Sequence, residues 1–97
     1  MKEHAQEVAS FVKAMAHLGR LQILLRLMEG EKNVSDLCRD LSMHQAGCSQ
    51  LLIRLRLEGL VSTRRDGKEI YYSISDYRVR RLIVAIQDIL RNEERTQ

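Results

Sequence analysis

The sequence predicts a mainly α-helical domain with one small β-hairpin, in the element order ααααββα. Before residue 59, apolar residues recur at spacings of three and four, which is the period of amphipathic helices. The dipeptide Asp66-Gly67 lies between two short strand-like segments and is a strong local signal for a β-hairpin. Helical spacing returns after residue 76. A hairpin that directly follows two short helices and a tight turn is a wing, so the expected fold is a winged helix-turn-helix.

Length and composition are those of one globular domain, residues 1–97, with a modest core. The net charge of +3 and the isoelectric point near 9.1 are mild indications of a polyanionic partner. No apolar run has the length of a membrane span, and the first ten residues lack a signal-peptide pattern. We therefore expect a cytoplasmic protein without membrane contact, whose two cysteines are free thiols.

Two helices are expected in the first third of the chain. The first, residues 3–17, has an apolar stripe that runs from Ala5 to Ala16. Gly19 is a plausible stop between this helix and the second one, which lies at about residues 20–29. The apolar residues of the second helix cover more than one face, which predicts a central helix that is buried on most sides.

Residues 33–59 contain the expected helix-turn-helix. Asn33 and Asp36 form a capping pair that begins the first helix of the motif. Residues 42–44 leave room only for a sharp turn before a second helix at about residues 44–58. The second helix of such a motif can enter the major groove of DNA.

The chain then changes to two strand candidates, residues 60–65 and 69–75, and a last helix at about residues 76–94. This helix and the first one are both amphipathic, and so small a core offers neither of them a full burial site. We therefore expect a symmetric homodimer that pairs the first and last helices of two copies. The alternative is that both apolar stripes pack inward within one chain.

The candidate DNA-binding site combines polar residues of the second motif helix with basic residues of the hairpin. Such side chains on the helix contact base edges or phosphates, whereas basic groups on a wing grip the sugar-phosphate backbone or the minor groove. The candidates are His44, Gln45, Gly47, Ser49, Gln50, Arg54, Arg56, Arg64, Arg65 and Lys68. The alternative for each of them is an ordinary solvated surface residue.

Three stretches resemble the ArsR/SmtB family of small bacterial winged-helix repressors, and together they cover nearly the whole chain. They are KAMAHLGRLQILLRL at residues 13–27, VSDLCRDLSMHQAGCSQLLIRLRLEGLV at residues 34–61 and TRRDGKEIYYSIS at residues 63–75. Leu18 stands where the family has proline, and His44 replaces a serine that would cap the helix better. The resemblance implies a dimeric repressor that leaves a palindromic double-stranded DNA operator when a metal ion or an oxidant changes the dimer.

The resemblance also implies where a sensor would lie. The family's metal sites use cysteines near the start of the first motif helix, where this chain has Asn33, Val34 and Ser35, or mixed sets on the last helix, which here lacks histidine. Zinc favours nitrogen and sulfur ligands, so we expect neither a metal site nor another cofactor. The chain is most similar to the family's redox- and sulfide-sensing branch, yet Leu25 and Arg91 occupy the positions of that branch's cysteine pair.

Cys38 and Cys48 are the two sulfur positions that remain. In the usual register of the motif these residues pack against each other, ten positions apart. One interpretation is that both are small core residues. The other is a thiol switch, because a disulfide can form if their Cα atoms lie within about 7 Å. Its closure would pull the two helices together, move the reading helix and weaken DNA binding.

Two functions are consistent with these features. The leading one is a sequence-specific DNA-binding repressor, and the alternative is a winged-helix module that binds another protein without sequence-specific DNA binding. An enzyme is not expected and no residue is assigned as catalytic, because the chain has no phosphate-binding glycine loop, no nucleophile with a base and no convincing pair of acids. The sequence leaves open the operator, the inducer and the choice between repression and activation.

Overall fold

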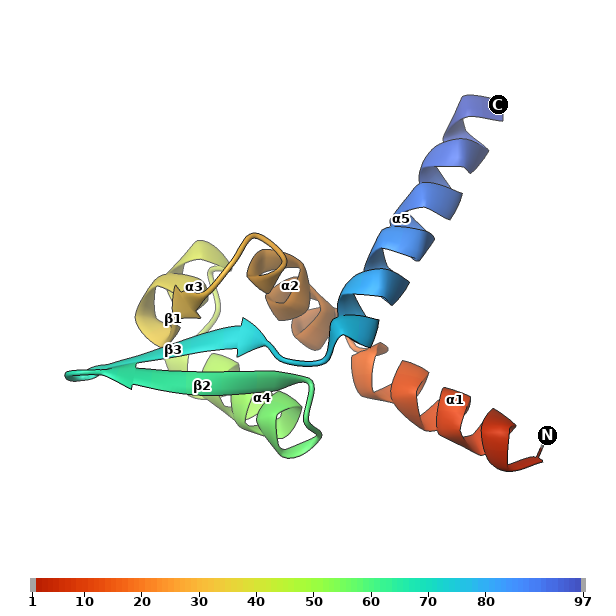
Figure 1. Cartoon of the computed structure of the whole chain (residues 1–97). Coiled ribbons are helices and arrows are strands. Elements are labelled where there is room, and N and C mark those ends of the chain that lie inside the picture. The colour runs from red at the N-terminus through yellow and green to blue at the C-terminus, as the bar shows by residue number, and fades with distance from the viewer. Residues whose placement is uncertain (1, 97) are drawn as a thin grey trace.

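The computed structural model describes the backbone of residues 2–96 and the side chains of residues 4–92. Its elements are, in chain order, α1 (Lys2–Met15), α2 (Leu18–Leu27), β1 (Lys32–Asn33), α3 (Val34–Asp40), α4 (Gln45–Leu57), β2 (Val61–Asp66), β3 (Glu69–Ile74) and α5 (Tyr77–Thr96) (Figure 1). This architecture confirms the predicted winged helix-turn-helix, with α3 and α4 as the motif and β2 and β3 as the wing. It differs from the predicted order by one additional strand, β1.

The boundary between α1 and α2 differs from the prediction. The side chain of His17 caps α2, because its Nδ1 accepts a hydrogen bond from the backbone N–H of Arg20 at 3.3 Å. Gly19 was expected to separate the two helices, but it lies inside the first turn of α2. A Cβ atom at this position would lie only 2.8 Å from Cδ1 of Leu51. Glycine is therefore needed here for close packing of α2 on α4 rather than for a helix stop.

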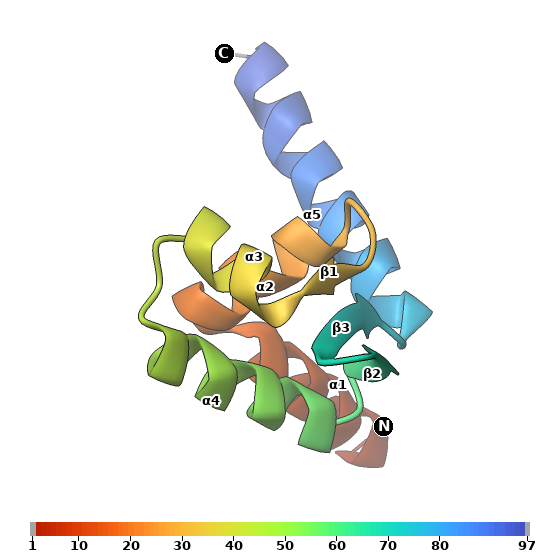
Figure 2. The ribbon, with the colours of Figure 1, turned by 90° about the vertical axis from the view of Figure 1, so that its left-hand side faces the viewer.

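The sheet has the strand order β1-β3-β2 and is antiparallel throughout. In β1, Lys32 pairs with Tyr72 and Asn33 pairs with Tyr71. A strand of two residues has no alternation that a sequence pattern can reveal. The hairpin closes where Asp66 pairs with Glu69, as its turn residues predicted. Figure 2 shows the three strands beside α3 and α4, with α4 at the outside of the molecule.

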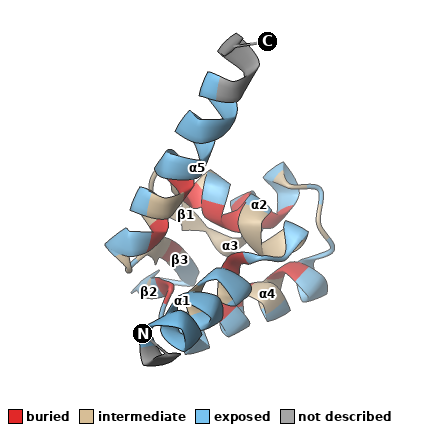
Figure 3. Cartoon of the chain, turned by 90° about the vertical axis from the view of Figure 1, so that its right-hand side faces the viewer, coloured by how far each residue is buried: buried red, intermediate tan, exposed pale blue. Residues whose placement is uncertain are grey.

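The core lies where α2, α3, α4 and the sheet meet, with the first turns of α5 against it (Figure 3). Its fully buried side chains are Ile23, Leu24, Leu27, Leu37, Cys48, Leu52, Leu55 and Val79. Burial of one large apolar side chain stabilises the fold by about 1.5–3 kcal/mol. These residues confirm α2 as the central helix and hold α4 by its inner face alone, so the outer face of α4 is free.

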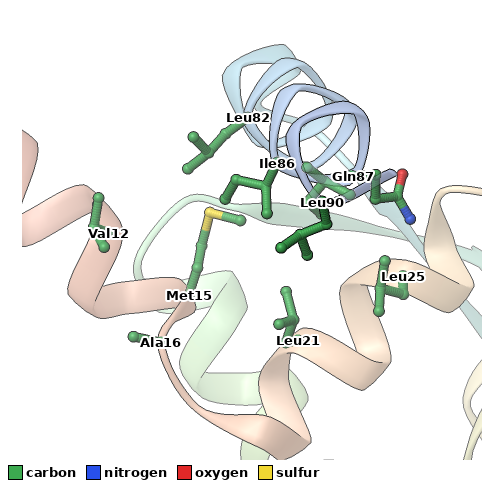
Figure 4. A pocket seen from close by; sticks show the side chains of 10 residues that line it. Val12, Met15, Ala16, Leu21, Leu25, Leu82, Ile86, Gln87 and Leu90 are labelled. Atoms are coloured by element: carbon green, nitrogen blue, oxygen red, sulfur yellow. The ribbon is translucent and has the colours of Figure 1, made fainter. Parts of the chain in front are cut away.

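The two terminal helices leave much of their apolar surface uncovered. Met15, Val79 and Ile83 are buried, but further apolar side chains of α1 and α5 are 45–64% exposed, namely Val8, Val12, Val84, Ile86, Ile89 and Leu90. Between α1, α2 and α5 lies an open apolar groove of about 310 Å³ (Figure 4). The alternative in which both stripes pack fully inward is therefore not the arrangement within this chain.

Candidate DNA-binding interface

The turn between α3 and α4 sets the direction of the outer helix. The side-chain oxygen of Asn33 accepts a hydrogen bond from the backbone N–H of Asp36 at 2.8 Å and begins α3, as predicted. After α3, Ser42 adopts a left-handed conformation with φ of +54°. The backbone N–H of Met43 then donates to the carbonyl oxygen of Cys38 at 2.9 Å. This tight reversal starts α4 at once in a new direction.

The first turn of α4 has no side-chain cap. His44 occupies the N-cap position but makes no capping hydrogen bond with its side chain, in agreement with the replacement of serine by histidine. The early backbone N–H groups of α4 are therefore not satisfied by this side chain and can face an anion. The imidazole of His44 is exposed and lies at the same end of the helix.

The structure separates the two faces of α4. Cys48, Leu52 and Leu55 point into the core and are at most 1% exposed. The predicted contact residues lie off this buried face: His44, Gln45, Gly47, Gln50, Arg54 and Arg56 are exposed, and Ser49 is half-buried. The helix thus presents amide, hydroxyl and guanidinium groups outward, which are the groups that bind base edges and phosphates in a major groove.

Arg64 of the wing is held by residues far away in the sequence. Its guanidinium donates to the carboxylate of Glu31 at 2.9 and 2.6 Å and lies 4.7 Å from the ring centre of Tyr71. The hydrogen bonds with Glu31 raise the pKa of Arg64, and the same contact lowers the pKa of Glu31. Arg64 therefore ties the wing to the segment just before β1, although the sequence predicted it only as a DNA contact.

Sequence reasoning missed Glu31 because no local pattern links two residues 33 positions apart. The strand pairing is what brings the two residues together. Tyr71 of β3 pairs with Arg64 on one side and with Asn33 on the other, and Asn33 follows Glu31 by two positions.

The remaining basic candidates divide into paired and unpaired groups. Arg54 forms an ion pair with Glu58 at 3.4 Å, one turn further along α4. Among the residues that the structure describes, Arg56, Arg65 and Lys68 form no ion pair, and all three are exposed. Their charges are therefore available to an external polyanion, whereas those of Arg54 and Arg64 are partly neutralised within the protein.

Cys38 and Cys48 meet where α3 crosses α4, and they form a disulfide bond. Their Cα atoms are 5.8 Å apart, which satisfies the distance condition expected from the sequence. The expectation of free thiols is therefore wrong for this structure, in which neither cysteine is free. Both residues are buried, at 3% and 1% exposure, so the bond belongs to the core of the motif.

In the part of the chain that the structure describes, no group of three or more histidine, cysteine, aspartate or glutamate side chains could hold a metal ion. No single described helix is long and apolar enough to cross a membrane. Helices α1 and α2 would reach that length only together, and they are bent by 84° at the break between them.

Known proteins resemble this chain in sequence. A family model described as "Bacterial regulatory protein, arsR family" matches residues 18–63, from α2 into β2. The biofilm growth-associated repressor of Xylella fastidiosa is 35% identical over 95 residues, which are 98% of this chain and 83% of that protein. The transcriptional activator HlyU of Vibrio cholerae is 36% identical over 83 residues, which are 86% of this chain and 77% of that protein.

Solved structures also resemble the fold of this chain. Reduced HlyU from Vibrio cholerae matches with a TM-score of 0.85 and 34% identity, over 92% of this chain and 94% of that one. Mb0332 from Mycobacterium bovis, solved as a homodimeric winged helix-turn-helix DNA-binding domain, matches with a TM-score of 0.85 and 32% identity. That match covers 99% of this chain and 89% of the other, so it includes both terminal helices.

Proposed function

We propose that this DNA-binding regulator, a chain that belongs to the arsR family of bacterial regulatory proteins, represses transcription by binding a palindromic operator as a homodimer. The observation that carries the proposal is the outer face of α4, whose polar side chains are exposed while its inner face is fixed in the core. The unpaired cations of the wing belong to the same winged unit. The protein is a regulator and not an enzyme, and it would act on DNA in the bacterial cytoplasm.

The uncovered faces of α1 and α5 support the dimer. A second copy related by a two-fold axis would bury the apolar side chains that each chain leaves exposed. The homodimeric structure of Mb0332 has the same fold over both terminal helices. Such a dimer would place its two α4 helices in major grooves one helical turn, about 34–36 Å, or a multiple of it apart. The operator should therefore be a palindrome with that half-site spacing.

The proposed DNA contacts fall into groups according to the chemistry of each side chain. We assign Gln45, Ser49 and Gln50 to base edges or phosphates, and His44 and Gly47 to the backbone near the start of α4. The cations Arg54, Arg56, Arg65 and Lys68 would bind phosphates, the first of them after release from Glu58. Arg64 would act mainly through its contact with Glu31, which fixes the position of the wing.

The test is selection of bound sequences from a pool of random duplexes, followed by titration at several salt concentrations. We expect a palindromic motif and an affinity that falls steeply with salt. Gln50→Ala should cost about 1–3 kcal/mol on the selected duplex and relax base preference at one position per half-site. Absence of any enriched motif, together with salt-independent binding, would instead support the protein-interaction module.

Control by thiol oxidation is the second part of the proposal. Oxidation removes two protons and two electrons from the thiols of Cys38 and Cys48 and forms one S–S bond, while hydrogen peroxide accepts them and becomes two molecules of water. The Cα distance of 5.8 Å lies within the usual disulfide range of about 4.4–6.8 Å. The fold that contains the bond also resembles that of reduced HlyU. The two cysteines therefore lie within bonding reach where α3 crosses α4.

We infer that the bond holds α4 on α3 in its reading orientation, so that reduction loosens the motif. The expectation from the sequence, in which closure moves α4 and weakens DNA binding, is the alternative. The chain-entropy model for a crosslink that spans ten positions gives about 3 kcal/mol of added stability. Operator binding and thermal unfolding of the oxidised and reduced protein test this, with Cys38→Ala/Cys48→Val as a control that cannot be oxidised. Weaker operator binding after oxidation would contradict the proposal that the bond supports DNA binding. Equal stability of the oxidised and reduced forms would exclude regulation through this bond.

A further inference from the structure

We propose that Ile53 contacts a thymine methyl group in the operator and so helps to determine sequence specificity. This inference rests on the proposed DNA binding and names a residue that the polar pattern of the sequence did not suggest. Ile53 lies in the middle of α4, and its side chain is 53% exposed. Isoleucine is not favoured on an exposed helix surface by helix propensity, because its β-branched side chain loses rotamer freedom there.

The position of Ile53 on α4 is that of a reading residue. It follows Gln50 by three positions and Ala46 by seven, so these three side chains lie along one face of the helix. The opposite face, which includes Leu52 and Leu55, is buried against the core. Because α4 packs on α2, α3 and β2 through that inner face, the ridge of Ala46, Gln50 and Ile53 lies on the exposed side of the helix. Figure 2 shows α4 itself at the outside of the molecule.

The surroundings of Ile53 favour DNA over an apolar protein surface as its partner. Arg54 and Arg56 lie on the helix surface on either side of the ridge, and both side chains are exposed. An apolar protein partner would have to remove both guanidinium groups from water. Arg54 has Glu58 as a counter-charge, but Arg56 forms no ion pair among the described residues, so its burial would be costly. A DNA major groove instead places apolar methyl groups on its floor and phosphates along both of its walls, which matches this pattern of charge.

Gln50, the neighbour of Ile53 on the ridge, indicates which bases this face of α4 would contact. The thymine C5-methyl is the apolar group that the major groove presents, and glutamine makes two hydrogen bonds to adenine there. The helix rise places Ile53 about 4.5 Å further along the axis than Gln50, which is close to the base-pair step of about 3.4 Å. Gln50 and Ile53 would thus read an adenine and a thymine in the same or adjacent base pairs of each half-site.

The experiment uses the whole protein and the duplex that wild type selects from the random pool. Each thymine in turn is replaced by deoxyuridine, which removes the methyl group and keeps every hydrogen-bonding group. We expect one symmetric thymine position at which this replacement weakens wild-type binding about fourfold per half-site, as expected for one buried carbon group. Ile53→Ala should bind the unmodified duplex correspondingly more weakly and should not respond to the replacement at that position.

Leu57→Ala is the matched control, because Leu57 lies one turn further along the same ridge and is 79% exposed. It should keep the wild-type response to deoxyuridine, and thermal unfolding should show that both exposed-site variants fold normally. Equal responses of wild type and Ile53→Ala at every thymine would overturn the inference while leaving the proposed function intact. Failure of wild type to select any motif would instead refute the proposed function, and this inference with it.

Discussion

Helices α4 and α5 both carry apolar residues along their length, but they bury different shares of them within one chain. In α4, Leu52 and Leu55 are fully buried, so the inner face of this helix is covered by its own chain. In α5, only the first turns reach the core, and Ile86, Ile89 and Leu90 remain 45%, 64% and 60% exposed. The winged unit is therefore stabilised by its own core, whereas the terminal helices leave apolar surface that a second copy would cover.

The largest effect is expected from substitutions on the exposed apolar face of α5. Ile86→Ala combined with Leu90→Ala removes two apolar side chains that a partner copy would bury. We expect dimerisation to weaken by about 3–6 kcal/mol, because the dimer loses four such side chains, each about half exposed in one chain. Sedimentation equilibrium measures the change, and operator binding should fall with it. A dimer of unchanged stability would show that the exposed stripe of α5 is not the interface.

The next effect concerns the buried face of α4. Leu55→Ala should lower the free energy of unfolding by about 2–5 kcal/mol, because it leaves a cavity in the core. Chemical denaturation of the variant measures this, with Ile53→Ala on the exposed face of the same helix as the control. The control should change stability by no more than about 0.5 kcal/mol. Similar losses at both positions would contradict the separation of inner and outer faces.

A smaller effect is expected at the junction between β3 and α5. Asp76 begins α5, because its carboxylate accepts hydrogen bonds from the backbone N–H and the guanidinium of Arg78. The guanidinium contact lowers the pKa of Asp76. The resulting stability is present above the ordinary pKa of 3.8 and is lost as the pH falls through the lower pKa of the folded state.

Asp76→Ala should therefore cost about 1 kcal/mol at neutral pH, the usual worth of an N-cap. Unfolding followed from pH 7 down to strongly acidic pH measures the difference. The stability gap between wild type and variant should close in acid. A gap that stays constant with pH would mean that the charge of Asp76 does not contribute.

The smallest effect is expected for Glu31→Gln, which removes the ion pair between Glu31 and Arg64 of the wing. The pair is exposed, and exposed ion pairs contribute little and are screened by salt. We expect a slight loss of thermal stability at low salt that disappears at high salt, because the lowered pKa of Glu31 reflects this one contact. A loss that is large or independent of salt would show that the wing depends on the pair more than its exposure suggests.

Local patterns were sufficient for most of the fold and for part of the candidate site. The spacing of apolar residues predicted five helices, and Asp66-Gly67 predicted the hairpin, because helices and tight turns are determined by residues close together in the chain. The register of the motif also predicted that Cys38 and Cys48 meet. The chain's membership of the arsR family follows from the same stretches of sequence.

Contacts between distant residues decided the rest, and no local pattern contains them. Strand β1 exists only through its pairing with β3, and Glu31 finds Arg64 only once the wing has folded beside that strand. Ile53 and Leu55 are both apolar residues, but packing buried Leu55 and left Ile53 exposed. The helices, the hairpin and the reading motif thus follow from local sequence. Which side chains remain exposed follows from the packing of each helix on its neighbours, which no local pattern contains.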